Sequence, residues 1–198
     1  MRPPEGTEGL TSFGPDRAVA VWFRDHVQTS GPLVDAGHVV AVAFHPWTFR
    51  VLVLLGCLLV WRAGRGRAAL VVGATMALGS LLGVALKVLF ARPRPVWGEP
   101  VATEVGYSMP SGHALNAALG VGLLLVLAWP WLRARGATVP AVAAGAVVVA
   151  VTALDRLVLG VHYLSDVTVG VVLGAGLALL AGRLASRSAR SAAVARGR

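Results

Sequence analysis

Long apolar stretches recur along this chain and constrain its fold more than any other feature. Five such stretches follow one another, at about residues 47–61, 68–90, 114–131, 139–157 and 163–184. An α-helix rises about 1.5 Å per residue, so roughly 20 apolar residues cross the ~30 Å hydrocarbon core of a bilayer. We therefore predict an all-α fold, a polytopic transmembrane helical bundle with five firm spans.

The composition supports a protein that lives in lipid. Hydrophobic residues make up 56% of the 198 residues and charged residues only 14%, with a mean hydropathy of +0.72. Soluble domains carry about a quarter charged residues. The net charge of +9 could suggest nucleic acid as a partner, but the basic residues cluster in short loops and in the tail, as on the cytoplasmic side of membrane proteins. We therefore exclude nucleic-acid binding.

The two ends of the chain differ from its middle. Residues 1–45 form a polar or amphipathic segment, and we expect an interfacial helix there or a sixth, N-terminal span. They lack the pattern of a secretory signal peptide. Because 47–61 is short for a full crossing, we expect that span either to begin earlier, across Pro46, or to tilt very little. Residues 46–184 form the membrane domain, and 185–198 a basic tail of low complexity that we expect to be disordered and cytoplasmic.

The distribution of charge predicts the orientation. The loops at 62–67 and 133–135 and the C-terminal tail carry arginines and no acidic residue. The acidic residues lie toward the opposite face, if residues 1–46 are counted there. By the positive-inside rule the arginine-only face is cytoplasmic. The opposite face of this multi-pass cell-membrane protein is then extracytoplasmic.

Three polar clusters are expected on that outer face. They read "KVLFARPRP" at 87–95, "SMPSGHA" at 108–114 and "RLVLGVHYLSD" at 156–166, and each lies at the end of an apolar stretch. Alternating spans bring these ends to one surface. Charged side chains are costly within a membrane and least costly near the interface. Arginine and lysine could serve as interfacial anchors. That role does not explain the two histidines and Asp166.

Together these clusters resemble the three signature motifs of the type 2 phosphatidic acid phosphatase and vanadium haloperoxidase superfamily, K-x6-RP, PSGH and SR-x5-H-x3-D. Lys87, Arg94 and Pro95 fit the first motif. Pro110 to His113 fit the second, and Arg156, His162 and Asp166 fit the third. The motifs cover residues 87–166 in the order of the family. The family's helical bundle agrees with the apolar stretches on either side.

The resemblance implies a metal-independent enzyme without a cofactor, in which a histidine attacks phosphorus and becomes a phosphohistidine. His162 matches that nucleophile. Asp166 lies four residues later, on the same face of a helix, and would fix the tautomer of the imidazole. His113 matches the general acid that protonates the leaving oxygen.

The remaining matched residues would hold the phosphoryl group. Lys87, Arg94 and Arg156 match the family's phosphate-binding cations, and Lys87 is the only lysine of the chain. Ser111 and Gly112 precede a helix, where a serine caps free amide groups and the helix dipole favours an anion. We expect the Ser111 hydroxyl and the Gly112 amide to contact phosphoryl oxygens, as in the family.

Two positions stand outside the pattern. Asp155 replaces the serine that the family places before the arginine, and its carboxylate should repel an anionic substrate unless it pairs with Arg156 or Arg94. Arg92 lies out of register with the first motif, and we expect it to be a bystander of the chemistry.

The resemblance implies an integral membrane phosphatase that acts on lipid phosphates or diphosphates at the outer leaflet. Candidate substrates are polyprenyl diphosphate, phosphatidic acid and phosphatidylglycerophosphate, and we favour a polyprenyl diphosphate or a related lipid phosphate. The alternatives are a vanadate-dependent haloperoxidase, whose relatives are soluble and larger, and a non-catalytic lipid-phosphate binding or transport homologue. Transporters carry broken helices and polar groups at mid-membrane. The sequence leaves the oligomeric state open.

Overall fold

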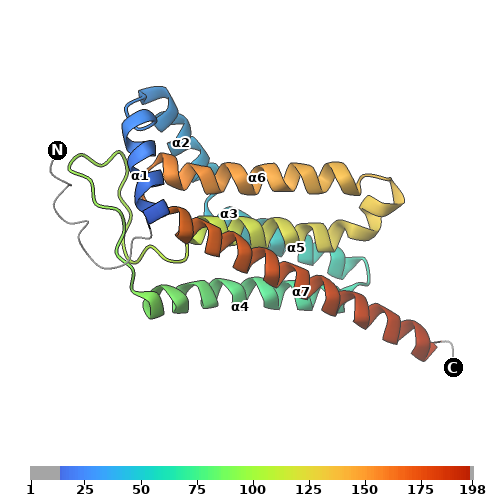
Figure 1. Ribbon diagram of the computed structural model, residues 1–198. Helices are drawn as coiled ribbons and strands as arrows, with labels where there is room; N and C mark the ends of the chain where they lie inside the picture. The colour runs from blue at the N-terminus through green and yellow to red at the C-terminus, as the bar shows by residue number, and fades with distance from the viewer. Residues whose placement is uncertain (1–13, 197–198) are drawn as a thin grey trace.

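Seven α-helices build the part of the chain that the structure describes. This computed structural model describes residues 14–196, with the side chains of residues 14–186. The helices are α1 (Gly14–His26), α2 (Gly31–Ala43), α3 (Pro46–Arg62), α4 (Gly66–Phe90), α5 (Gly112–Ala134), α6 (Thr138–Val158) and α7 (Leu164–Arg196) (Figure 1).

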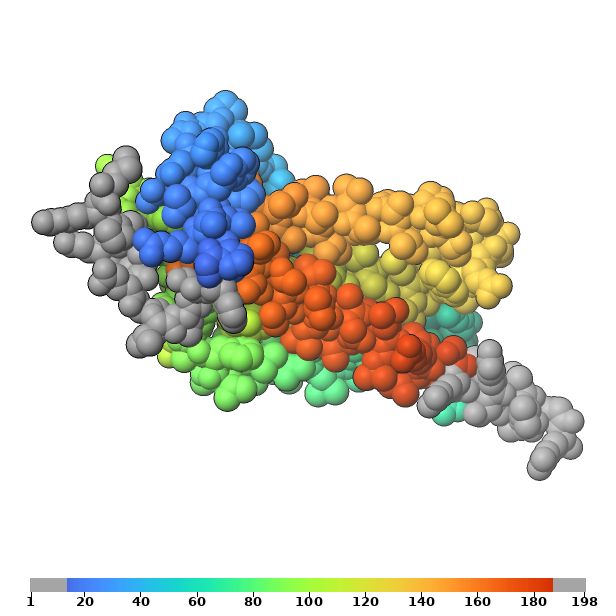
Figure 2. Space-filling model, in the orientation of Figure 1, coloured from blue at the N-terminus to red at the C-terminus, as the bar shows by residue number. Residues whose placement is uncertain are grey.

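Five helical stretches are long and apolar enough to cross a membrane, which confirms the predicted all-α bundle with five spans. They are 31–62, formed by α2 and α3 together, and then α4, α5, α6 and the part of α7 up to Ser186. Helix α1 is the amphipathic segment expected near the N-terminus, and with α2 it lies across one end of the bundle (Figure 2).

The first span does not run through Pro46 as one helix. Phe44 and His45 interrupt it, and His45 has an extended backbone with a ψ of 146°. The residue before a proline is disfavoured in the helical region, whereas proline fits the first turn of a helix because it needs no amide hydrogen there. The span does begin before Pro46, as expected, but it consists of two helices, and α3 itself begins at Pro46.

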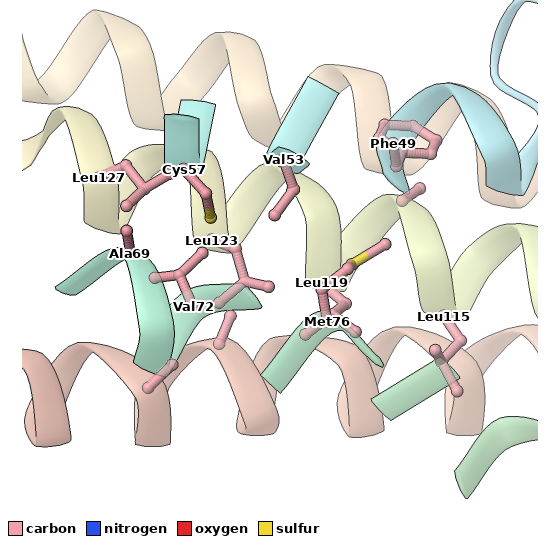
Figure 3. Close-up of a cluster of buried hydrophobic side chains, with 13 residues drawn as sticks. Phe49, Val53, Cys57, Ala69, Val72, Met76, Leu115, Leu119, Leu123 and Leu127 are labelled. Atoms are coloured by element: carbon pink, nitrogen blue, oxygen red, sulfur yellow. The ribbon is translucent and has the colours of Figure 1, made fainter. Parts of the chain in front are cut away.

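Helix α5 is the centre of the bundle. Its side chains Leu115, Leu119, Leu123 and Leu127 are buried against residues of α3, α4 and α7 (Figure 3). From α3 come Phe49, Val53 and Cys57, and from α4 Ala69, Val72 and Met76. The side chains that point away from this core, such as Leu59, Leu81 and Leu179, are largely exposed, as expected for a surface covered by lipid.

Two glycines let α7 approach the backbone of α5. A Cβ atom on Gly170 would lie 2.8 Å from the carbonyl oxygen of Ser111, and one on Gly174 would lie 2.5 Å from that of Leu115. Small residues four apart allow such close packing in membranes. The contact fixes the start of α7 beside the start of α5.

All three motif segments lie at one end of the bundle (Figure 1). Helices α4 and α6 end there, and α5 and α7 begin there. Helix α4 stops at Phe90 because Ala91 takes a left-handed backbone with a φ of 44° and prolines follow. The loop 91–111 then crosses this end of the molecule and leads into α5.

The C-terminal segment departs from its expected disorder. Helix α7 continues to Arg196, because alanine and arginine are among the strongest helix formers. The first thirteen residues of the predicted N-terminal segment and the last two of the tail lie outside the described residues.

Candidate active site

His162 and Asp166 lie side by side, although not on one face of a helix as predicted. His162 precedes α7, and Asp166 is in the first turn of that helix. The Asp166 Oδ2 atom accepts a hydrogen bond from the Tyr163 backbone N–H at 2.9 Å and lies 3.5 Å from His162 Nδ1. The turn that begins α7 brings the two side chains together, in the way that an acidic residue caps the start of a helix.

Arg94 determines which nitrogen of His162 carries the ring proton. Its Nη1 atom lies 3.1 Å from His162 Nε2 and donates to the Val161 carbonyl oxygen at 2.9 Å. A guanidinium group can only donate hydrogen bonds, so Nε2 must accept and the ring proton must lie on Nδ1, facing Asp166. The lone pair of Nε2 is therefore directed toward the cationic side of the site.

The surroundings of His162 keep its ring neutral. Only 2% of its surface is exposed. Burial lowers the pKa of the imidazole, and the positive charge of Arg94 acts in the same direction, whereas Asp166 opposes it. A neutral imidazole retains the lone pair that a nucleophile requires.

His113 presents the opposite tautomer. Arg156 Nη1 lies 3.3 Å from His113 Nδ1, which by the same reasoning must accept, so the proton lies on Nε2. This Nε2 atom is buried and has no hydrogen-bond partner among the described residues. An unpaired buried N–H is costly, and a ligand oxygen would satisfy it.

The start of α5 supplies a second unpaired group. Ser111 is completely buried, and its backbone N–H donates to the Asp166 carbonyl oxygen at 3.0 Å. Its hydroxyl does not cap α5, contrary to the general rule for serines at this position, and has no hydrogen-bond partner among the described residues. The hydroxyl and the amides after it are thus available to an anion.

Lys87 lies next to this helix start. A Cβ atom on Gly112 would lie 4.0 Å from Lys87 Cε, and the ammonium group donates to the Tyr107 carbonyl oxygen at 2.6 Å. An ammonium group has three hydrogens, so this bond leaves donors for a ligand at the same place.

Asp155, which replaces the serine of the third motif, forms an ion pair with its neighbour Arg156. Its Oδ2 atom accepts from Arg156 Nε at 2.9 Å and also from Arg156 Nη2. Arg156 is 1% exposed, so a serine in place of Asp155 would leave this buried cation with less compensation. Asp155 therefore pairs with Arg156, one of the two partners considered for it, and among the described residues it forms no ion pair with Arg94.

Glu104 is a residue of this site that sequence reasoning missed. It comes from the loop 91–111, and its carboxylate lies 2.8 Å from Arg156 Nη1, 3.2 Å from Arg94 Nη2 and 3.9 Å from His113 Nδ1. Although burial raises its pKa, Arg94 and Arg156 prevail and hold the pKa of Glu104 below its usual value. An anion therefore already occupies the space between the matched cations.

Arg92 is not the bystander that its register suggested. It is buried, and it forms ion pairs of 2.7 Å with both Asp166 and Asp16. Asp16 belongs to α1, far from every motif in the sequence, and no spacing rule could have identified it.

The structure also contains an apolar groove. It lies between α3 and α4, has a volume of about 490 Å³, and is lined by residues that include Val53, Met76 and Val84. Lys87 follows Val84 by three residues, about one turn of α4. Among the described residues, no group of three or more His, Cys, Asp or Glu could hold a metal ion.

Comparison with known proteins identifies the family. The family model described as the PAP2 superfamily matches residues 68–190. The chain is 39% identical to decaprenylphosphoryl-5-phosphoribose phosphatase of Mycobacterium tuberculosis over 131 residues, which are 63% of this chain and 64% of the relative. The aligned part thus spans a little less than two thirds of that relative's length.

Two proteins of Bacillus subtilis are also similar. Phosphatidylglycerophosphatase B is 35% identical over 97 residues, 48% of this chain and 46% of the relative. The crystal structure of a transmembrane PAP2-type phosphatidylglycerolphosphate phosphatase matches with a TM-score of 0.56 and 22% identity, covering 88% of this chain and 98% of that chain. This likeness shows that the fold is shared.

Proposed function

Because this chain belongs to the PAP2 superfamily, we propose that it is a membrane phosphatase that removes a phosphoryl group from a lipid. One observation carries the proposal: three groups lie at the bundle end that also holds Lys87, Arg94 and Arg156. They are the unprotonated Nε2 atom of His162, the Nε2–H of His113 and the Ser111 hydroxyl. His162 supplies a nucleophile and His113 a proton donor. The Ser111 hydroxyl and the three cations supply a binding site for the phosphoryl group.

In the first step His162 Nε2 attacks phosphorus, and the bond between phosphorus and the lipid oxygen breaks. The developing charge on the phosphoryl oxygens is stabilised by the cations and the amides at the start of α5, a contribution that usually dominates such catalysis. The negative charge of the bound phosphate favours uptake of a second proton by His113 at Nδ1, which then no longer accepts the hydrogen bond from Arg156. His113 then gives its Nε2 proton to the leaving lipid oxygen, so that a lipid alcohol departs.

In the second step water releases the phosphoryl group. His113, now neutral, accepts a proton from a water molecule while the water oxygen attacks the phosphohistidine. The bond between phosphorus and nitrogen breaks, and its electrons return to His162 Nε2. Asp166 holds the Nδ1 proton throughout, so the ring leaves the cycle with its original tautomer. Inorganic phosphate is the second product.

The substrate that we favour is a lipid-linked phosphate monoester. The names of both relatives describe enzymes that act on a phosphate attached to a lipid-borne head group. The groove between α3 and α4 offers apolar surface that extends to Val84, one turn of α4 before Lys87, and such a surface suits a hydrocarbon chain better than a soluble phosphate. Polyprenyl diphosphate, which the sequence favoured, is the second candidate because the same clamp can bind a terminal diphosphate.

We propose that the site faces the extracytoplasmic side. The arginine-rich loops that follow α3 and α5 lie at the other end of the bundle (Figure 1), as the positive-inside rule requires of a cytoplasmic face.

The test is phosphate release by the purified protein in detergent, with and without a chelator. The panel comprises a polyprenylphosphoryl pentose 5-phosphate, phosphatidylglycerophosphate, phosphatidic acid and a polyprenyl diphosphate. We expect turnover of at least one phosphate monoester, unchanged by chelator. His162→Gln should reduce it by at least about a thousandfold, as loss of a covalent nucleophile does.

Each alternative has its own outcome in this assay. Loss of activity with the chelator would contradict the metal-free mechanism, and preserved activity in His162→Gln would contradict the nucleophile. Binding of a lipid phosphate without release of phosphate would favour the non-catalytic homologue. Halide oxidation that requires added vanadate would favour the haloperoxidase.

A further inference from the structure

We propose that Asp16 of α1, acting through Arg92, positions Asp166 and keeps its negative charge available to His162. The inference rests on the proposed function and deepens it, because it makes the N-terminal helix part of the catalytic apparatus. Asp16 and Arg92 are positioning residues, since both act through Asp166 rather than on the phosphoryl group.

The guanidinium group of Arg92 lies between two carboxylates. Its Nη1 atom is 2.7 Å from Asp166 Oδ1, and its Nη2 atom is 2.7 Å from Asp16 Oδ2. The Tyr163 ring faces the guanidinium carbon at 4.3 Å. Asp16, Arg92 and Asp166 are only 2%, 6% and 0% exposed, so water cannot replace a partner that is lost. The bond to Arg92 engages Oδ1 of Asp166 and leaves Oδ2 for His162.

Asp16 also holds the segment that joins the nucleophile to its partner. The Ser165 backbone N–H donates to Asp16 Oδ1 at 2.8 Å, and the Ser165 hydroxyl donates to Asp16 Oδ2 at 2.6 Å. The first amides of a helix have no partner within it. Asp16 therefore caps α7 from another helix, and it fixes the backbone between His162 and Asp166.

The balance of charge gives Asp16 a second effect. If Arg92 paired with Asp166 alone, the two charges would cancel beside the nucleophile. Because Arg92 is shared with Asp16, two carboxylates and one guanidinium leave one net negative charge. His162 becomes cationic when its Nε2 atom bonds to phosphorus, and a fixed negative charge close to Nδ1 stabilises that state.

The experiment compares Asp16→Asn with the wild-type protein in the phosphate-release assay. Asparagine keeps the shape and an oxygen for the Ser165 amide but removes the charge. We expect kcat to fall by about ten- to a hundredfold, because a poorly placed catalytic group costs a reaction about this much in rate. We expect KM to stay within about twofold, because the phosphate-binding cations are unchanged. The matched control is Asp25→Asn on the same helix, where the side chain is 47% exposed; it should leave both constants unaltered.

Ser165→Ala provides a second variant that retains every charge. It removes the hydroxyl that bonds to Asp16 and Arg92, and we expect a smaller loss of kcat with the same unchanged KM. Thermal unfolding of each variant identifies those that remain folded at the assay temperature.

A folded Asp16→Asn protein with wild-type kcat would overturn the inference. So would an unfolded Asp16→Asn protein together with a fully active Ser165→Ala protein. Neither result would contradict the proposed function. The proposed function fails only if the wild-type protein releases phosphate from no lipid of the panel.

Discussion

The carboxylate of Glu104 occupies a position that a phosphoryl group would need. It contacts Arg94 and Arg156, two of the three cations matched to phosphate binding, and its side chain is 30% exposed. A bound phosphate must therefore displace a resident anion, and the energy of that displacement reduces the apparent affinity.

Replacement of Glu104 by glutamine tests this competition. We expect KM for the lipid phosphate, and the inhibition constant of inorganic phosphate, to fall by about tenfold, since a charge-assisted hydrogen bond contributes roughly 1.5–3 kcal/mol. The control is Glu99→Gln, an exposed glutamate of the same loop. An unchanged or higher KM in Glu104→Gln would show that the carboxylate helps substrate binding instead.

The lowered pKa of His162 predicts how the free energy of unfolding depends on pH. Its folded-state pKa is lowered, first by burial and then by Arg94, so between that value and the ordinary pKa of about 6.5 the unfolded chain binds more protons. Stability is therefore complete above about pH 6.5 and decreases as the pH falls below it, by at most about 1.4 kcal/mol per pH unit.

Thermal unfolding in detergent at pH 7.5 and pH 5.5 measures this effect. The wild-type midpoint should fall more between these values than that of His162→Gln, which carries no titrating ring. Parallel shifts in the two proteins would mean that other groups cause the pH dependence.

Motif register identified the residues that we propose to contact phosphate, but not the residues that support them. Lys87, Arg94 and His162 follow a spacing that the chemistry imposes, and the structure brings them to one place. Asp16 and Glu104 act through tertiary contacts across long separations in sequence. Such partners depend on how α1 and the loop 91–111 fold back, and no local pattern encodes that.

At the scale of the helices, the contact between α5 and α7 joins the second motif to the third. Gly170 lies against the carbonyl oxygen of Ser111, and that residue in turn bonds to Asp166 through its amide. The separation of these helices therefore determines the distance between the start of α5 and the segment that carries His162 and Asp166.

Gly170→Ala should disturb both stability and activity. Its new methyl group would lie 2.8 Å from a backbone atom, and overpacking of this kind costs typically 1–3 kcal/mol. We expect a lower unfolding temperature and a loss of kcat in the protein that remains folded. Gly176→Ala is the matched control on α7, because no atom lies within 4 Å of its added methyl group. A Gly170→Ala protein that behaves like the control would show that the helices can separate without cost to the site.

The apolar pattern predicted the elements well and their junctions less well. Apolar length alone identified the five crossings, because the bilayer imposes it on any spanning helix. The break at His45 arose from the backbone restriction at Pro46, which local sequence contains but apolar counting ignores. The packing of α2 and α1 over the site end depends on contacts such as that of Gly37 with Leu159, which a hydropathy pattern does not specify.

At the scale of the whole molecule, charge separates the two ends of the bundle. The site end carries acidic residues on α1, α2 and the loop 91–111, whereas the opposite loops carry arginine. Translocation of arginine-rich loops is disfavoured, so the site end should be the one that crosses the membrane during insertion. A lipid phosphate would then meet the site from the outer leaflet.

Single-cysteine labelling in intact cells checks this orientation. In a Cys57→Ala background, Glu99→Cys marks the site end and Arg135→Cys the opposite end, and both positions are exposed. A membrane-impermeant maleimide should label position 99 in intact cells and position 135 only after lysis. The opposite pattern would place the phosphate clamp in the cytosol, and the arginine loops would then be an exception to the positive-inside rule. Both cysteine variants are first assayed for phosphate release, before the maleimide is added. Activity in this assay shows that the variants are correctly folded.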